Sequence, residues 1–453
     1  MRDTTELLRL AARRSLDYAE AVDSRRVNPT TASIEALATF DEPLPNEGTD
    51  PGETLALLDG TGSPATIGST GPNYFGFVNG ATLPIALATS WLADTWDQNA
   101  ALPVMSPVSA RIHDVASRWL VDLLGLSETT EVAFVSGATV ANATGLAAAR
   151  DAMLADAGWD VQSDGLFGAP EVQVVVGAQS HSTLGKSLGL VGLGRSRVHV
   201  VPADDQGRMR SDRMPDVDGP VLVCAQAGEV NTGAFDPFEP IADWCASRSG
   251  WLHVDGAFGL WALADPGRAD LVRGLERADS LATDAHKWLN VTYDSGIAFV
   301  RRPGALSRTF ASVAGYLPPD DGFEPMHHAP QSSQRARQIE VWSVLRTLGR
   351  QGMVRLVTRA CEAAEAIADG LRHGRCTILN DVVLNQVLVR LVDGATTEAL
   401  VGEIQRDGRI WCGPTQWQGE TAMRISVSSW KTTVEDGESA ATVINECAER
   451  VLR

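Results

Sequence analysis

Short apolar runs alternate with longer helical segments through the middle of the chain. Six runs rich in valine, isoleucine and leucine are predicted strands: EVAFV (131–135), VQVVV (172–176), VHVV (198–201), VLVCA (221–225), WLHVD (251–255) and GIAFV (296–300). Between several of them lie Ala- or Leu-rich segments of helical length, such as 139–156 and 237–249. Continuous apolar strands separated by helices are typical of a parallel sheet covered on both faces, so the pattern predicts an α/β fold.

Two flanking regions differ from this central pattern. In the C-terminal region, VLNQVLVRLV (383–392) and AMRISVSSW (422–430) are predicted strands, and a closing helix is predicted within 433–452. The N-terminal region begins with an amphipathic helix and has a Pro/Gly-rich stretch from 43 to 72, which is typical of an extension. We therefore expect three parts: an N-terminal arm over 1–85, a large domain over 86–350 and a small domain over 351–453.

Composition and charge narrow the possible partners. The 453 residues include 38 lysines and arginines against 57 acidic residues, a formal net charge of −19. This charge repels phosphate backbones and anionic membranes, so we expect neither nucleic acid nor a membrane as a partner. No apolar run approaches the ~20 residues that span a bilayer, and the N-terminus lacks the apolar core of a secretory signal. Six scattered cysteines without a CxxC pair predict no metal site and no disulfide framework, and they favour the cytoplasm.

Chemically distinctive residues follow three of the predicted strands, at the edge where parallel sheets bind ligands. SGATVAN (136–142) opens a helix whose free N–H groups suit an anion, although an ordinary strand–turn–helix junction uses the same residues. His181 is either a working group or a hydrogen-bonded cap. Asp255 ends a buried strand, so it requires a cation or a donor, with a helix cap as the alternative.

Lys287 stands between His286 and Trp288, just ahead of the predicted strand 296–300. Burial favours the neutral amine, which can form a Schiff base with a carbonyl. The alternative is a surface lysine whose stem lies on Trp288. Taken together, the four sites offer an anion cradle, an aromatic plane, a carboxylate for a ring nitrogen and an amine for an aldehyde. These are the contacts that pyridoxal 5'-phosphate requires.

The same residues carry a resemblance to a known family. The matching segments are GPNYFGF (71–77), SPVSARIHDVASRWLVDLLGL (106–126), SGATVAN (136–142), QSHSTLGKSLGL (179–190), NTGAFDP (231–237), WLHVDGAFG (251–259), DAHKWLN (284–290) and RISVSSW (424–430). With them the chain resembles, nearly end to end, the group II pyridoxal-phosphate-dependent decarboxylases of aromatic L-amino acids, glutamate and histidine. The 32 residues from Asp255 to Lys287 (287 − 255) match the family's register.

The resemblance implies a fold-type I enzyme. We therefore expect a large domain with a mostly parallel seven-stranded sheet, a small C-terminal α/β domain and an N-terminal arm. The family also implies a homodimer whose active site is shared between subunits, with the arm in contact with the partner.

The resemblance also implies roles for individual residues. The expected cofactor contacts are Ala138, Thr139, His181, Asp255, Ala257, Asp284, His286 and Lys287. Lys287 matches the lysine that holds the cofactor as an internal aldimine, and Asp255 matches the partner of the pyridine nitrogen. His181 is expected to stack on one face of the ring, with Ala257 against the other. Ala138, Thr139 and His286 match positions that hold the phosphate, and Asp284 stands where some relatives have asparagine.

Substrate and reaction type follow less directly. Tyr316 matches a loop tyrosine implicated in returning a proton, where relatives that make aldehydes carry phenylalanine. Tyr74, Phe75 and Phe77 resemble aromatic residues of the family's substrate pocket. These matches favour decarboxylation of an aromatic L-amino acid to the amine and CO2. Another reaction on the same cofactor (transamination, a lyase step or aldehyde synthesis) is the alternative, and a non-catalytic scaffold is a remote one.

One segment departs from the family pattern. The chain has Glu229 and Val230 where threonines are expected ahead of Phe-Asp-Pro. A carboxylate there would change the hydrogen bonding of the cofactor's phenolic oxygen unless the side chain points away.

Overall fold

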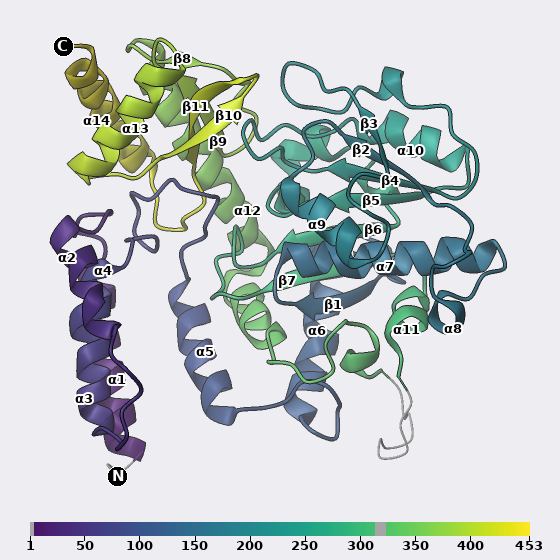
Figure 1. Cartoon of the computed structure of the whole chain (residues 1–453), viewed down its shortest axis with the longest axis horizontal. Coiled ribbons are helices and arrows are strands. Elements are labelled where there is room, and N and C mark those ends of the chain that lie inside the picture. Colours follow the sequence, from purple (N-terminus) through teal and green to yellow (C-terminus); the bar gives the residue numbers. More distant parts are fainter. Residues whose placement is uncertain (1–3, 313–322) are drawn as a thin grey trace. The chain divides into compact units, whose positions relative to one another are not determined.

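The computed structural model describes residues 4–312 and 323–453, and these form two compact units (Figure 1). Unit 1 contains Met1–Asn79, Glu362–Leu379 and Val387–Arg453, and unit 2 contains Gly80–Cys361 and Asn380–Gln386. Each unit is built around its own sheet. Among the described residues, none of the helices combines the length and the hydropathy needed to cross a bilayer.

Unit 2 is organised around a seven-stranded sheet. Its strands are β1 (Glu131–Val135), β2 (Gln173–Gly177), β3 (Val198–Val201), β4 (Val221–Gln226), β5 (Trp251–Asp255), β6 (Ser280–Asp284) and β7 (Gly296–Val300). They lie in the order β1-β7-β6-β5-β4-β2-β3, and β7 alone runs antiparallel to its neighbours. Every position of β4 to β7 is buried, so both faces of the sheet are covered. The predicted mostly parallel seven-stranded sheet is confirmed.

β6 is the strand that the apolar pattern did not indicate. Its sequence, SLATD, holds a single large apolar residue, Leu281, yet all five positions are buried. The polar side chains are accommodated by hydrogen bonds: Ser280 Oγ accepts from Trp251 Nε1 at 2.8 Å. A strand whose polar groups find partners only in the folded sheet does not show the apolar run by which buried strands are recognised.

Helices surround the sheet of unit 2. They are α5 (Pro84–Trp96), α6 (Pro107–Leu123), α7 (Ala138–Asp156), α8 (Val161–Asp164), α9 (Ser182–Leu190), α10 (Phe238–Ala246) and α11 (Ala305–Phe310), with 3₁₀ turns at Ser211–Arg213, Gly259–Ala264, Pro266–Val272, Leu275–Arg277 and Pro325–His327. α7 packs against β6 and β7 (Figure 1). Its alanines and glycine let the helix approach the sheet closely, and its buried alanines belong to the apolar cluster that includes residues of the strands. α12 (Gln338–Arg372) runs from unit 2 into unit 1 and is kinked at Gly349, whose φ is 58°.

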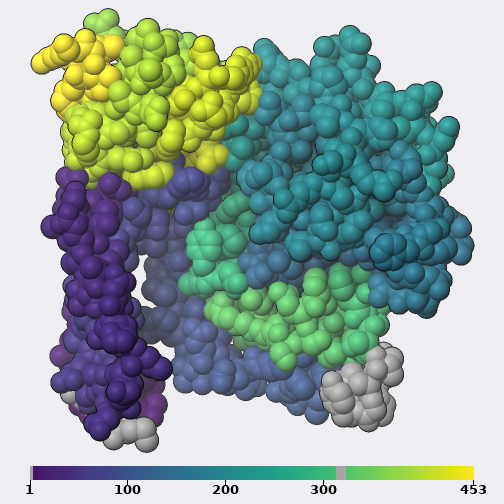
Figure 2. Space-filling view, in the orientation of Figure 1, coloured from purple at the N-terminus to yellow at the C-terminus, as the bar shows by residue number. Residues whose placement is uncertain are grey.

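Unit 1 combines the N-terminal segment with the C-terminal α/β element. Its helices are α1 (Thr4–Ala21), α2 (Thr31–Glu35), α3 (Pro51–Leu57), α4 (Ser63–Ala65), α13 (Gly394–Asp407) and α14 (Val434–Leu452), with short turns at Ala36–Phe40 and Leu58–Gly62. The strands β8 (Thr377–Ile378), β9 (Gln386–Arg390), β10 (Gly413–Trp417) and β11 (Glu420–Ser426) lie in the order β10-β11-β9-β8. α1 and α14 confirm the two helices predicted near the chain ends. None of the side chains of α1 is buried. Figure 2 shows the N-terminal segment in purple.

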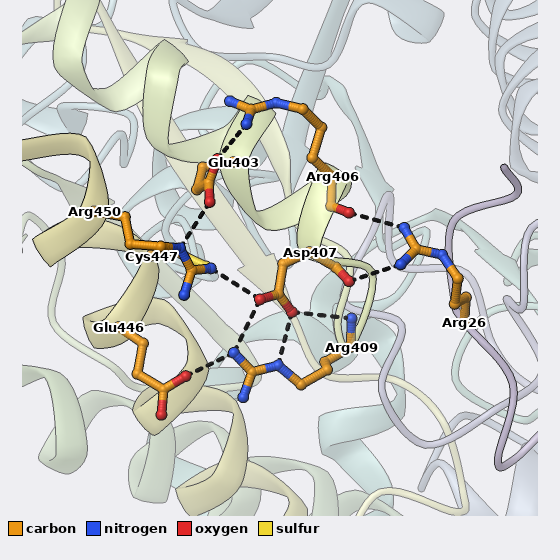
Figure 3. A network of polar contacts seen from close by, with 8 residues as sticks. All are labelled: Arg26, Glu403, Arg406, Asp407, Arg409, Glu446, Cys447 and Arg450. Atoms are coloured by element: carbon orange, nitrogen blue, oxygen red, sulfur yellow. Dashed lines mark hydrogen bonds and ion pairs between the residues drawn. The ribbon is translucent and has the colours of Figure 1, made fainter. Parts of the chain in front are cut away.

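An ion-pair network joins the N-terminal segment to α13 within unit 1 (Figure 3). Asp407 accepts hydrogen bonds from Arg409 Nε at 2.7 Å and from Arg450 Nη2 at 2.8 Å. The Arg26 guanidinium donates to the main-chain carbonyls of Arg406 and Asp407, at 2.8 and 3.0 Å. Hydrogen bonding from Arg409 lowers the pKa of Asp407 to about 2. The network therefore satisfies the carbonyl end of α13 and fixes residue 26 against it.

Candidate active site

The candidate site lies at the carboxyl edge of the large sheet. β1, β5 and β6 run in one direction, and the segments that follow them begin at Ser136, Gly256 and Ala285. Asp255 and Ala282 are paired in register on adjacent strands. The predicted residues that follow separate strands therefore come from one edge of the sheet, as parallel topology requires.

Lys287 lies in the turn between β6 and β7 and is fixed by an acidic neighbour. Its Nζ atom is 2.9 Å from Asp284 Oδ2, and 21% of its side chain is exposed. His286 Nε2 lies 3.5 Å from the other oxygen of Asp284. The neighbouring Trp288 is 1% exposed, so its ring is part of the core. Asp284 thus orients the Lys287 amine and the His286 ring together.

The start of α7 reaches the same carboxylate. The Ala138 N–H donates to Asp284 Oδ1 at 2.5 Å, and no side chain caps the helix at Gly137. A Cβ atom on Gly137 would lie 3.3 Å from Asp284 Oδ1, and one on Gly296 would lie 2.4 Å from the Gly137 Cα. A side chain at position 296 would therefore collide with the main chain of Gly137, and one at position 137 would crowd Asp284. The positive end of the α7 dipole is thereby brought to the Lys287 turn, which suits an anionic group.

Asp255 is the buried carboxylate of the site. It is 5% exposed, and its Oδ1 accepts the Ala257 N–H at 3.1 Å. Burial raises the pKa of the Asp255 carboxyl group, and interactions with His181 and Lys287 oppose that rise. Asp255, His181 and Lys287 therefore lie within electrostatic reach of one another, although they are far apart in the sequence.

His181 forms the N-cap of α9. Its Nδ1 accepts from the Thr183 N–H at 3.4 Å and lies 2.7 Å from Thr183 Oγ1. The capping alternative is thus observed, and it leaves the ring near Asp255. Among the other expected contacts, Thr139 follows Ala138 in the first turn of α7, and the Ala257 carbonyl accepts the Asp284 N–H at 2.9 Å.

The structure answers the question raised by Glu229. This residue is 1% exposed, and one of its carboxylate oxygens accepts the main-chain N–H groups of Asn231 and Thr232, each at 2.7 Å. The other oxygen accepts from Asn231 Nδ2 at 3.0 Å. Burial raises the pKa of Glu229, and these hydrogen bonds oppose the rise. The carboxylate therefore braces its own turn, in which Val230 is also held.

The expected substrate residues belong to unit 1. Tyr74 stacks on Trp411 with ring centroids 5.1 Å apart, and Phe77 lies 5.4 Å from the same ring. Phe75 is fully buried, whereas Phe77 is 59% exposed. Burial raises the pKa of Tyr74 to about 12. Tyr316 lies outside the described residues.

Four residues beside the site were not predicted from the sequence. Gly80 lies against the Lys287 carbonyl, and Asn290 anchors the same turn by accepting the Ala81 N–H at 3.0 Å. His253 lies on β5 and Asn142 on α7, and both side chains are fully buried. The signal for His253 is its position two residues before Asp255, which places both polar side chains on one face of a buried strand.

This donor set suits pyridoxal phosphate. Lys287 offers an amine for the aldehyde, and Asp255 offers a carboxylate for the pyridine nitrogen. The start of α7 and His286 offer donors for the phosphate. Asn142 Nδ2 is a buried donor that meets no acceptor at good geometry among the described residues. These groups fit the cofactor without further ligands.

Comparison with known sequences agrees with this chemistry. The family model described as the pyridoxal-dependent decarboxylase conserved domain matches residues 64–392. An aromatic-L-amino-acid decarboxylase of Bacillus atrophaeus is 25% identical, over 96% of this chain and 93% of its own length. A histidine decarboxylase of Drosophila melanogaster is 28% identical over 96% of this chain and 54% of its own length. An L-2,4-diaminobutyrate decarboxylase of Rhizobium meliloti (strain 1021) is 28% identical over 79% and 72% of the two chains.

Solved structures share the fold. Oryza sativa TDC, crystallised with PLP and tryptamine, has a TM-score of 0.92 at 22% identity and covers 100% of this chain and 98% of its own. Mouse CSAD has a TM-score of 0.90 at 20% identity, with 98% of each chain covered. Rhodiola rosea 4-hydroxyphenylacetaldehyde synthase has a TM-score of 0.88 at 19% identity, with 100% of each chain covered. At these identities the likeness establishes the fold alone.

Proposed function

The chain belongs to the pyridoxal-dependent decarboxylase family, and from that premise we propose that it converts an aromatic L-amino acid to the amine and CO2. As a member of the family it is a carboxy-lyase that acts on an amino acid and uses pyridoxal 5'-phosphate. When bound, this cofactor supplies an electron-withdrawing ring that stabilises the charge left on Cα as CO2 departs. The identity of the amino acid and the roles of single residues are the proposed part.

The proposal assigns the cofactor contacts to the residues of the sheet edge. Lys287 would hold the cofactor by its aldehyde, and Asp255 would supply the negative charge that favours a protonated pyridine nitrogen. His181 and Ala257 would contact the ring, and Ala138, Thr139 and His286 would hold the phosphate. The observation that carries this assignment is that Lys287 and His181 both act on the buried Asp255, while Asp284 contacts Lys287, His286 and the start of α7.

The chain's own residues contribute orientation and electrostatics to the reaction. Asp284 forms an ion pair with Lys287 Nζ and so directs the amine. Asp255 is buried, so its negative charge would stabilise a protonated pyridine nitrogen more strongly than an exposed carboxylate could. Tyr316 is the proposed donor of the proton that replaces the lost carboxylate, on the strength of its matching position in the chain.

An aromatic substrate is proposed from two sources. Tyr74, Phe75 and Phe77 match the family's pocket aromatics, and Phe77 offers an exposed ring for stacking. The Bacillus relative is named for aromatic L-amino acids. The histidine and diaminobutyrate relatives name the substrates against which this preference is tested.

The test is a panel of the standard L-amino acids with 2,4-diaminobutyrate added. CO2, amine, keto acid and aldehyde are quantified in parallel. We expect CO2 and amine in equal amounts, with kcat/KM highest for tryptophan, phenylalanine or tyrosine. A keto acid or aldehyde as the main product would contradict the reaction type, and a preference for histidine or diaminobutyrate would contradict the substrate class.

Lys287→Ala, with Lys186→Ala as its control, tests the assignment of the lysine. Lys186 is an exposed residue on α9. We expect Lys287→Ala to lose the visible absorbance of the bound cofactor and CO2 release, and Lys186→Ala to keep both. A Lys287→Ala protein that keeps the absorbance and full turnover would refute the assignment.

A cytoplasmic homodimer is also proposed. In unit 1, Leu8, Leu16 and Leu58 are 55 to 59% exposed, and in α5 of unit 2, Leu92 and Trp96 are 55% and 44% exposed. Such apolar surfaces are typical of interfaces. All six cysteines are buried thiols, which a reducing compartment preserves. Light scattering after gel filtration should give twice the mass of 48.3 kDa, and Leu8→Glu with Leu16→Glu should shift the species toward the monomer. A monomer at micromolar concentration would contradict the dimer.

A further inference from the structure

A chain of buried hydrogen bonds runs across the sheet toward Asp255. Trp251 Nε1 lies 2.8 Å from Ser280 Oγ, and Ser280 Oγ lies 2.8 Å from His253 Nδ1. His253 Nε2 lies 2.8 Å from Asn142 Oδ1. Ser280, His253 and Asn142 are fully buried, and Trp251 is 3% exposed. None of these four residues has been assigned a contact with the cofactor.

The direction of this chain is determined by its two end members, Trp251 and Asn142. The Trp251 indole can only donate, so Ser280 Oγ accepts from it, while Asn142 Oδ1 can only accept, so His253 Nε2 must carry a proton. Burial lowers the pKa of His253 to about 3, so the ring is neutral; with its one proton on Nε2, Nδ1 accepts from Ser280 Oγ. Nε2 therefore donates to Asn142 Oδ1. The oxygen of the amide is thereby fixed toward His253, and its Nδ2 group is directed to the opposite side.

The Asp255 carboxyl group is the other group with which the Asn142 side chain interacts. Asn142 Nδ2 meets no acceptor at good hydrogen-bond geometry among the described residues, yet the amide lies near enough to lower the pKa of the Asp255 carboxyl group. Three features bring the groups together. His253 and Asp255 share one face of β5, and Asn142 follows Ala138 by one turn on α7. α7 packs against β5 and β6.

We propose that His253 and Asn142 are positioning residues that hold the Asp255 carboxylate, through the Asn142 amide N–H, in the place and charge state needed by the pyridine nitrogen. This inference rests on the proposed role of Asp255. An N–H group beside the carboxylate favours its ionised form and so opposes the effect of burial. Without it, the carboxyl group more readily keeps the proton that the ring nitrogen needs. Neither residue touches the reacting atoms in this proposal.

A matched pair of variants separates the relay from simple packing. In His253→Gln the side-chain amide can place an N–H group near the position of Nε2, whereas in His253→Asn the shorter amide reaches only the position of Nδ1. Asn142→Leu is the second test, because it nearly keeps the shape of the side chain and removes the amide. Asp255→Asn is the reference, because it removes the charge at the end of the relay.

The readouts are cofactor affinity, the ¹⁵N chemical shift of the pyridine nitrogen in labelled pyridoxal phosphate bound to the full chain, and the melting temperature of the cofactor-free protein. We expect His253→Asn and Asn142→Leu to move the ¹⁵N shift in the same direction as Asp255→Asn. We also expect them to weaken cofactor binding by about tenfold or more, the usual effect of losing a hydrogen bond to a charged group. His253→Gln should stay close to the wild type in both.

The role of Asp255 and the role of His253 and Asn142 are refuted by different results. If Asp255→Asn leaves the ¹⁵N shift unchanged, the proposed role of Asp255 is wrong. If Asp255→Asn moves the shift while His253→Asn and Asn142→Leu leave it at the wild-type value, the relay is overturned. A lower melting temperature alone, without a change of the ¹⁵N shift, would show a structural role only and would also overturn it. Should either variant fail to fold, the other decides.

Discussion

The contact between Gly80 and Lys287 makes a prediction with a magnitude that the structure supplies. A Cβ atom on Gly80 would lie 1.8 Å from the Lys287 carbonyl oxygen and 2.7 Å from that of His286. Both are main-chain atoms, so no flexible side chain can move aside. The same segment is tied to the turn by Asn290, whose side chain accepts the Ala81 N–H at 3.0 Å and whose carbonyl accepts the Leu83 N–H at 2.8 Å.

Gly80→Ala must therefore move the Lys287 turn. To bring the contact from 1.8 Å to 3.0 Å, the carbonyl oxygen has to retreat by at least 1.2 Å (3.0 − 1.8). A displacement of ~1 Å at a reacting group costs about 100-fold in rate, so we expect kcat/KM to fall about 100-fold. Overpacking should also lower the free energy of unfolding by about 1–3 kcal/mol.

The assay compares Gly80→Ala with Gly185→Ala. Gly185 lies in α9, where an added Cβ meets no described atom within 4 Å, so its substitution should leave cofactor affinity and kcat/KM unchanged. Cofactor affinity is measured by titrating the cofactor-free protein and following the visible absorbance. Wild-type affinity and kcat/KM in Gly80→Ala would refute the claim that the position of the Lys287 turn depends on this contact.

Three further predictions address other parts of the chain. Asp407→Asn should cost about 2 kcal/mol of stability at pH 7, because hydrogen bonding from Arg409 lowers the pKa of Asp407 from 3.8 to about 2. The ionised carboxylate stabilises the fold above pH 3.8, and this stabilisation is lost as the pH falls toward 2. The difference in the free energy of urea unfolding between wild type and variant should therefore narrow below pH 4. An equal difference at pH 7 and pH 3 would contradict this. Tyr316→Phe should slow amine formation by about 100-fold and raise the share of aldehyde, and an unchanged product ratio would remove Tyr316 from the reaction. Phe77→Ala should raise KM for the aromatic substrate while changing stability by less than about 0.5 kcal/mol, since Phe77 is 59% exposed; an unchanged KM would exclude it as a substrate contact.

Much of the large sheet could be predicted from the sequence because its strands are buried on both faces. β1, β3, β5 and β7 have the predicted bounds, while β2 is shifted by one residue and β4 is one residue longer. β6 was not predicted, because serine, threonine and aspartate fill three of its five positions. These polar groups are satisfied only by partners from other strands and helices, which a local pattern cannot show.

The candidate site was predictable where one residue carries a distinctive chemistry. Lys287 and Asp255 stood out because a lysine and a carboxylate beside buried strands require partners. The His253–Asn142 contact did not, because the two residues are 111 positions apart and each has an ordinary alternative in the core. Glu229 shows the same limit, since its orientation depends on a turn whose N–H groups converge on the carboxylate only after folding.

The lysine that binds the cofactor can be identified by chemical labelling. The chain has only three lysines, Lys186, Lys287 and Lys431, and the last pairs with Asp23 in unit 1. Borohydride reduction of the protein loaded with pyridoxal phosphate, followed by peptide mass spectrometry, fixes and locates the label. We expect one label per chain, on Lys287. A label on Lys186 or Lys431 with Lys287 unmodified would contradict it.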